Sequence, residues 1–373
     1  MKYHILYLIT NYKIGDGSSN AVYNQIKCDN DITEKYLIVC KHHGDVQKDL
    51  KIVQDSDILS IKNFMRHENL IIHYFKTSNS NILKQVLTIS DKRIPILTTV
   101  CQSPSYKRMI ITPFEFRVTN HFVFIDKSSF NDKLISFIPN ECKSLIYLTM
   151  GQYDEITASV PFPNNSPDIV FGRGTTLSKC PKNMFDIFDR INIKNKKFVI
   201  VGIPEGDNWV RLEASKRNNV FVYSVLPFDE WFSICKTFDI FLYQIPFECY
   251  SSLDGNLGLA MLMKKPVVYM GSDGPKERFV SGENGYIANT PEEMIAFAES
   301  LANNTELRHR IGEKARDSVL AHSRKNNRKA LYHNLYHNLY HLISCKKIPF
   351  WYYLIYIKRC YKDIIKDLFN LYK

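Results

Sequence analysis

The stretch YSSLDGNLGLAMLMKKPVVYMGSDGPKERFVSGENGYIAN, residues 250–289, is the most informative part of this chain. Its Asp-Gly-Asn at 254–256 suits a tight turn and a helix N-cap, and strong helix formers follow at 257–263. The first turn of such a helix leaves its N–H groups unpaired, and such groups bind anions. The sequence therefore predicts an anion-binding loop in front of this helix.

The residues after this helix predict a buried strand and a second loop. Lys264, Lys265 and Pro266 stop the helix, and the apolar Val-Val-Tyr-Met that follows is typical of a strand in a parallel sheet. Gly271 to Gly274 then opens a loop at the C-terminal edge of that strand. Doubly wound sheets bind their ligands at this edge, so we expect a ligand there.

These motifs resemble the donor-binding region of GT-B glycosyltransferases, in particular the large retaining family 4, or glycosyl transferases group 1. The resemblance is good over residues 168–320 and weaker before them. Six segments carry it: DIVFGR (168–173), FVIVG (198–202), DIFLYQIP (239–246), LGLAMLMKKPVV (257–268), DGPKE (273–277) and SGENGYI (281–287).

The resemblance implies an α/β protein with the GT-B architecture, in which two Rossmann-like, doubly wound parallel-sheet domains face a cleft. A chain of 373 residues is also too long for a single core. We expect an acceptor-side domain at 1–160 and a donor-binding domain at 161–330. Basic, aromatic helices at 331–373 should then pack back on the N-terminal domain or on a membrane surface.

Strands and helices alternate in the N-terminal half, which favours a parallel sheet with both faces covered. Gly15 and Gly17 form a loop, capped by Ser18 or Ser19, before a predicted helix at 21–27. This loop resembles the glycine-rich loop after the first strand of GT-B N-terminal domains, which faces the interdomain cleft, and the resemblance makes Gly15 and Gly17 candidates for donor binding. The predicted strands of this half are 3–10, 35–40, 70–75, 94–100 and 122–125.

The predicted loop GRGTTLSKCPK at 172–182, directly after an apolar strand, supplies basic candidates. Arg173 and Lys182 would form a catalytic clamp, because a guanidinium and an ammonium together stabilise a leaving diphosphate. Lys179 is the alternative phosphate lysine, but Lys182 precedes Asn183 and so fits the Lys-Asn pair of the family better. The alternative interpretation is that this Gly-Arg pair marks a solvated turn and has no functional role.

The donor loop departs from the family pattern at its two glutamates. Counting back from Pro266 places Ser251 at the first glutamate and Leu259 at the second, which binds ribose in the family. Glu248 or Asp254 could take over the first carboxylate, and we assign Glu248 a catalytic role. The remaining donor contacts are predicted at Ser251, Asp254, Gly255, Asn256, Leu257 and Gly258.

Two further residues of the N-terminal half attract attention. His73 ends the run NLIIHYF, where the family often has a strand-end histidine near acceptor and donor. The alternative is a partly buried histidine that bonds only to the backbone. Cys101 has no identifiable activating partner in the sequence, so we expect a structural thiol there.

Composition restricts the choice of partner and compartment. The net charge of +11 attracts phosphates, whether in nucleic acid, in an anionic membrane or in a small substrate. The nine cysteines lack metal-ligand or disulfide spacing, which indicates reduced thiols in the cytoplasm and no metal site. We expect neither a signal peptide nor a membrane-spanning helix.

The C-terminal residues contain two predicted helices. In 331–341, tyrosine, histidine and leucine each recur every four residues, and the histidines are read as a helix edge rather than as metal ligands. After Pro349, aromatic residues alternate with lysines. This second helix either packs on the N-terminal domain or lies on an anionic inner membrane, and both alternatives stay open.

The favoured function is the transfer of a sugar from a nucleotide-diphosphate sugar to a glycan or lipid-linked acceptor. The resemblance implies a retaining, metal-independent reaction without cofactor, in bacterial surface polysaccharide or lipopolysaccharide synthesis, at the inner face of the cell membrane. The alternatives are a nucleotide-sugar epimerase or phosphorylase-like enzyme, and a non-enzymatic basic binding protein. Nucleic acid is disfavoured because the chain lacks helix-turn-helix, zinc-finger and RNA-binding-sheet signatures.

Overall fold

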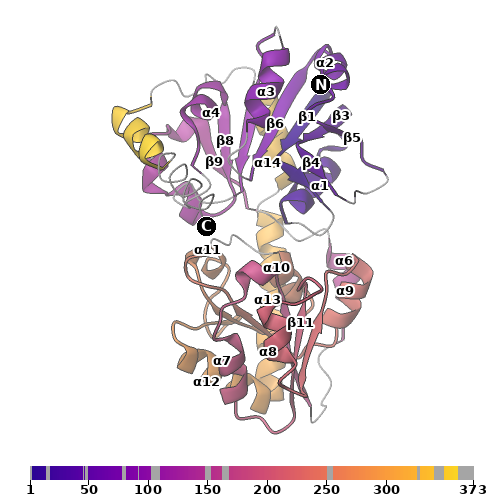
Figure 1. The fold of residues 1–373 in the computed structure, drawn as a ribbon, viewed down its shortest axis with the longest axis vertical. Helices are drawn as coiled ribbons and strands as arrows, with labels where there is room; N and C mark the ends of the chain where they lie inside the picture. Colours follow the sequence, from indigo (N-terminus) through magenta and orange to yellow (C-terminus); the bar gives the residue numbers. More distant parts are fainter. Residues whose placement is uncertain are drawn as a thin grey trace. The chain divides into compact units, whose positions relative to one another are not determined.

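The computed structural model describes residues 2–13, 17–44, 46, 49–77, 81–90, 92–101, 110–147, 153–161, 168–249, 255–325, 328–339 and 348–359. Contacts divide the chain into two compact units. Unit 1 comprises Met1–Leu148 with Arg328–Lys373, and unit 2 comprises Thr149–Asn327. Each unit is built on one parallel sheet with helices on both faces (Figure 1).

The sheet of unit 1 confirms the five predicted strands and adds a short strand at each edge. All pairs are parallel, and β1 lies between β3 and β6, where the strand order reverses. The edge strands were not expected, because three residues carry too little periodic pattern to be recognised. The order is β5 (Ile52–Gln54), β3 (Thr33–Cys40), β1 (Tyr3–Ile9), β6 (Leu70–Lys76), β7 (Ile96–Val100), β8 (His121–Phe124) and β9 (Lys143–Leu145).

Alternate residues of these strands feed two buried clusters, one on each face of the sheet. On one face α1 (Gly17–Asp29) and α14 (Arg328–Asn338) pack, and on the other α2 (Ile58–Met65) and α3 (Ile82–Ile89). Helix α1 starts at Gly17, so the expected loop is shorter than predicted and Ser18 and Ser19 lie inside the helix.

Helix α14 explains the four-residue tyrosine spacing. Tyr332 and Tyr336 are 1% and 0% exposed and share a cluster with Tyr3 and Tyr7 of β1. Of the predicted histidine stripe, His337 is exposed, His333 is half-buried and His341 lies outside the described residues. The tyrosine stripe is therefore the side on which the C-terminal part of the chain packs against unit 1.

The sheet of unit 2 has the strand order of a Rossmann domain. Strands β10, β11 and β12 run to one side, β13, β14 and β15 to the other, and all pairs are parallel. The order reverses between β10 and β13. In spatial order the strands are β12 (Val220–Tyr223), β11 (Lys196–Val201), β10 (Ile169–Gly174), β13 (Ile240–Gln244), β14 (Val267–Met270) and β15 (Tyr286–Ile287).

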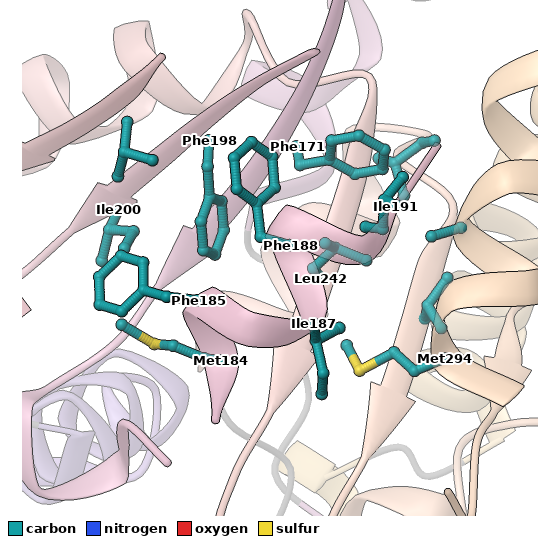
Figure 2. Close-up of a cluster of buried hydrophobic side chains, with 14 of the residues drawn as sticks. Phe171, Met184, Phe185, Ile187, Phe188, Ile191, Phe198, Ile200, Leu242 and Met294 are labelled. Atoms are coloured by element: carbon teal, nitrogen blue, oxygen red, sulfur yellow. The ribbon is translucent and has the colours of Figure 1, made fainter. Parts of the chain in front are cut away.

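Helices cover both faces of this sheet. One face buries α7 (Met184–Arg190), α8 (Trp209–Ala214) and α12 (Pro291–Asn303) in a cluster rich in phenylalanine. Figure 2 shows Phe188 of α7 beside Phe198 of β11, with ring centroids 5.0 Å apart. The opposite face buries α9 (Phe228–Cys235), α10 (Gly255–Leu262) and α13 (Thr305–Lys325).

Helix α10 ends where the sequence predicts, and the structure adds the reason. Lys264 adopts a left-handed conformation with φ 59°, and its carbonyl lies where a β-carbon on Gly312 of α13 would stand, 2.1 Å away. Only glycine allows α13 to approach this closely. The predicted loop after β14 contains a short helix instead, α11 (Asp273–Lys276), because Pro275 and its neighbours form one turn. None of the described helices combines the length and the apolar character needed to cross a bilayer.

Candidate functional site

The reversal of strand order between β10 and β13 defines the candidate site in unit 2. Gly172 of β10 pairs with Phe241 of β13, and both strands end a few residues later at the same edge of the sheet. The chains that leave these two strands must separate at this edge, which opens space for a ligand. Arg173 lies in β10, and Lys179, Glu248 and the N-terminus of α10 follow or border these two strands.

Arg173 lies in β10 and not in the loop after it, which corrects the prediction. Its side chain is 1% exposed, and Nη2 donates to the Lys179 carbonyl at 2.7 Å and to Thr175 Oγ1 at 3.3 Å. The guanidinium carbon lies 5.4 Å from the centroid of the Tyr243 ring of β13. Within the described residues the Nε–H has no hydrogen-bond partner. Arg173 therefore fixes the loop that follows it.

The structure separates the two candidate lysines. Lys182 is exposed, and its ammonium lies 4.2 Å from the centroid of the Trp209 ring at the start of α8. Lys179 ends a single 3-10 turn, Leu177–Lys179, and is half-buried. Leu177 of this turn packs against the buried cluster that contains Phe185 and Phe188 of α7, both labelled in Figure 2.

Lys179 lies close to the loop that follows β13. The Cys249 thiol of that loop donates to the Ser178 carbonyl at 3.6 Å. Burial raises the pKa of this thiol, the carboxylate of Glu248 adds to the rise, and the Lys179 ammonium opposes it. Glu248 itself is exposed. Lys179 and Glu248 thus share one neighbourhood at the sheet edge.

The N-terminus of α10 faces the end of β10. A β-carbon added to Gly174 would lie 2.9 Å from Asn256 Cγ, so only glycine fits at this point of the strand. Gly255 is exposed and is the first residue of α10. Leu257 and Gly258 lie in the first turn of α10 and are buried, so only their backbone N–H groups are candidates for a donor contact. Ser251 and Asp254 lie outside the described residues.

Two glycines close the edge, and sequence analysis gave them no role of this kind. Gly202 after β11 has φ 104°, and its β-carbon would lie 2.2 Å from the Thr175 carbonyl oxygen. Gly271 after β14 would bring a β-carbon within 2.3 Å of Ile245 after β13. Both glycines directly follow apolar strands, and that position is the signal that could have identified them.

Leu259 is 6% exposed and lies in the apolar cluster beneath α10, together with Phe241 and Tyr243. Its side chain faces hydrocarbon and offers no polar group to a ligand. The apolar character of Leu259 therefore fits its surroundings.

His73 is a structural residue, which corrects the catalytic assignment and also its backbone-bonded alternative. Strand β6 continues three residues beyond it to Lys76, and His73 is fully buried. One ring nitrogen, Nδ1, lies 2.7 Å from Tyr336 Oη and the other, Nε2, lies 2.8 Å from Thr99 Oγ1. Burial holds its pKa well below the usual value. Neither nitrogen is left for a substrate.

The other candidate residues of unit 1 provide no further evidence for a functional site. Gly15 lies outside the described residues, and Gly17 begins α1. Cys101 is buried, and its thiol donates to the Thr99 carbonyl at 3.8 Å. The candidate site therefore rests on unit 2.

Solved structures with the same fold are glycosyltransferases. HepE of Anabaena, in complex with UDP-glucose, matches with TM-score 0.67 and 14% identity over 89% of this chain and 99% of that chain. A glycosyltransferase of Rickettsia africae matches with TM-score 0.64 and 13% identity, covering 91% and 98%. The lipopolysaccharide outer core galactosyltransferase WaaB, in its apo form, matches with TM-score 0.60 and 15% identity, covering 89% and 100%.

These likenesses and the two parallel sheets show that the chain has the α/β GT-B fold. No protein-family model matches the sequence, and no curated protein matches it either.

Proposed function

We propose that this chain is a glycosyltransferase that binds a nucleotide-diphosphate sugar at the carboxyl edge of the unit 2 sheet. One observation carries the proposal: Arg173, Lys179 and the N-terminus of α10 meet at the strand-order reversal between β10 and β13. The fold is shared with HepE, whose structure contains UDP-glucose, and this supports a nucleotide sugar as donor.

The chemistry requires charge neutralisation more than a reactive side chain. The acceptor hydroxyl oxygen forms a bond to the anomeric carbon while the bond from that carbon to the diphosphate oxygen breaks, and the hydroxyl proton passes to the departing diphosphate. Three groups would stabilise the charge on the departing diphosphate: the Lys179 ammonium, the first N–H groups of α10, and the Arg173 Nε–H, which has no hydrogen-bond partner among the described residues. Glu248 would orient the hydroxyls of the sugar. We propose that the reaction retains anomeric configuration and needs no metal.

The acceptor belongs to the same proposal. We propose a glycan or lipid-linked acceptor, in the synthesis of a bacterial surface polysaccharide or lipopolysaccharide, reached from the cytoplasmic face of the membrane. The fold shared with WaaB supports this class of acceptor.

A thermal-shift screen in EDTA tests the donor. UDP-glucose, UDP-galactose, UDP-N-acetylglucosamine and GDP-mannose are added to the full chain, and one should raise the melting temperature. A ligand at about 100 times its Kd stabilises the folded state by about 2.7 kcal/mol. Incubation with the donor found and no acceptor should leave its sugar configuration unchanged, whereas an epimerase would convert it.

The two lysines provide the matched pair of variants. Lys179→Met should weaken UDP binding by about tenfold or more, since a charge-assisted phosphate contact contributes about 1.5–3 kcal/mol. Lys182→Met should change UDP binding less, because its ammonium lies over Trp209. If Lys182→Met weakens UDP binding more than Lys179→Met does, Lys182 is the phosphate lysine. If neither variant weakens UDP binding, this loop does not bind the diphosphate.

A further inference from the structure

The C-terminal helix, residues 350–359, carries an apolar face that is open to solvent. Phe350, Trp351, Leu354 and Ile357 are 75%, 41%, 52% and 57% exposed. Spacings of three and four residues place them on one side of the helix. Four large apolar side chains on ten residues is an unusual concentration for a surface without a partner.

The opposite side of the same helix is firmly attached to unit 1. Tyr352 is fully buried, and its hydroxyl donates to the Ile111 carbonyl at 2.5 Å. Its ring contacts Phe116 and Phe137 edge-on, each at a centroid distance of 5.2 Å. Trp351 lies 5.9 Å from Phe137. The exposed face is thus presented by an anchored helix, which Figure 1 shows in yellow.

Basic side chains border this apolar face. Lys358 follows Leu354 by four residues and is exposed on the same side. Exposed Arg117 reaches the helix from α4 (Pro113–Val118), where its Nη2 donates to Tyr353 Oη at 2.8 Å. Cations at the edge of an aromatic and aliphatic surface suit a layer with negative headgroups above hydrocarbon.

We propose that this face of residues 350–359 docks on an anionic lipid bilayer, with Phe350, Trp351, Leu354 and Ile357 in the boundary between headgroups and acyl chains. The charge pattern favours a bilayer over a second copy of the chain, since a twofold interface would bring Arg117 and Lys358 of both copies together. Docking would hold the enzyme at the membrane, where lipid-linked acceptors occur. In this respect the proposal rests on the proposed function.

Flotation of the full chain with vesicles tests the proposal. Vesicles with about one third phosphatidylglycerol in phosphatidylcholine should bind the protein, and pure phosphatidylcholine should bind it less. Raising the salt concentration should weaken the anionic preference, because the Debye length shortens. Trp351 fluorescence should shift to the blue on binding, and the shift should be absent in Trp351→Phe, which keeps Trp209 and Trp231.

The decisive variant is Leu354→Ser with Ile357→Ser, which should weaken vesicle binding by about tenfold or more. The matched control is Leu212→Ser with Val225→Ser, two residues of unit 2 that are 57% and 59% exposed. The control should bind vesicles as the unchanged chain does. Lys358→Gln should weaken binding to anionic vesicles by about fivefold and to neutral vesicles little.

Three results would overturn the proposal. One is equal vesicle binding of the unchanged chain and the Leu354/Ile357 variant. The second is a dimer, seen by light scattering, that this variant abolishes, since the face would then join two copies. The third is vesicle binding that appears only after residues 360–373 are deleted. That result would mean that residues 360–373 cover the apolar face in the full chain. The thermal shift with UDP should be the same in all these variants, so failure of docking and failure of donor binding are distinguishable.

Discussion

Gly174 and Asn256 touch at the point where β10 meets the N-terminus of α10. A β-carbon on Gly174 would stand 2.9 Å from Asn256 Cγ and 3.2 Å from Asn256 Cβ. Because Gly174 ends a strand and Asn256 begins a helix, this contact sets how closely α10 approaches the switch point of the sheet.

We expect Gly174→Ala to lower the free energy of unfolding by about 1–3 kcal/mol, the usual result of overpacking. Adding Asn256→Ala should restore part of the loss, because it removes the atom that the new methyl group meets. Urea unfolding of the two single variants and the double variant measures this coupling. Gly255→Ala is the control, since nothing lies within 4 Å of its added β-carbon. Additive effects of Gly174→Ala and Asn256→Ala would contradict the contact.

Arg173→Met should reduce both stability and UDP binding. The methionine keeps much of the volume, but the Lys179 carbonyl loses a buried donor, which costs about 1–3 kcal/mol. Unfolding and UDP calorimetry on the same sample measure the two effects. Arg190→Met serves as control, because Arg190 forms only exposed ion pairs with Asp186 and Glu292. If Arg173→Met weakens UDP binding but leaves the free energy of unfolding unchanged, Arg173 contacts the ligand and does not stabilise the loop.

The limits of sequence reasoning are clear at Arg173. The apolar run before it predicts β10, but Gly172 and Gly174 suggested a turn. The strand continues because Arg173 pairs with Ile200 and Gly174 with Val201 of β11. Pairing with a distant strand leaves no local signal, whereas the β-branched and aromatic runs that form the central strands are local and were read correctly.

The misassignment of His73 has the same origin. Its partners, Thr99 and Tyr336, lie 26 and 263 residues away in the sequence, and one of them comes from α14. The tyrosine stripe on α14 was visible in the sequence, but nothing in it indicated which strand it would cover. Gly202 and Gly271 likewise depend on neighbours contributed by other strands.

Acid should destabilise unit 1 through His73. Burial holds its folded pKa well below the usual value of 6.5, so in mildly acidic solution the unfolded chain binds a proton that the folded chain does not. Stability is fully present above pH 6.5 and is lost as the pH falls below that value. Urea unfolding between pH 7.5 and 5 should show a smaller loss in His73→Gln than in the unchanged chain, and an equal loss in exposed His43→Gln. Equal slopes in all three would contradict burial of a neutral His73.

Asp29 should make unit 1 more stable in acid, which is opposite to the effect of His73. It accepts from Tyr7 and Tyr336, and burial raises its pKa from 3.8 to about 6. A folded pKa above the unfolded one gives stability that is present below pH 3.8 and lost as the pH rises through 6. The loss amounts to about 3 kcal/mol. Asp29→Asn should remove this term from the unfolding curve, so that the acid sensitivity from His73 becomes steeper. A curve unchanged by Asp29→Asn would mean that the pKa of this carboxyl is not raised in the folded state.

The last prediction concerns Leu259 and the ribose of the donor. Since Leu259 lies in hydrocarbon below α10, donor affinity should come from the diphosphate and the sugar. UDP and 2′-deoxy-UDP should then bind within about threefold of each other by calorimetry, because a site that hydrogen-bonds a buried hydroxyl rejects its deoxy analogue by well over tenfold.

The variant Leu259→Glu tests whether position 259 contacts the ribose or only packs in the apolar cluster. A carboxylate at a position that is 6% exposed should lower the free energy of unfolding by several kcal/mol without strengthening UDP binding. Leu259→Met, of similar volume, is the control and should change neither. Strong discrimination against 2′-deoxy-UDP would show that another group holds the ribose, and we would then seek it at Glu248. Tighter UDP binding in a stable Leu259→Glu chain would show that this position reaches the ribose after all.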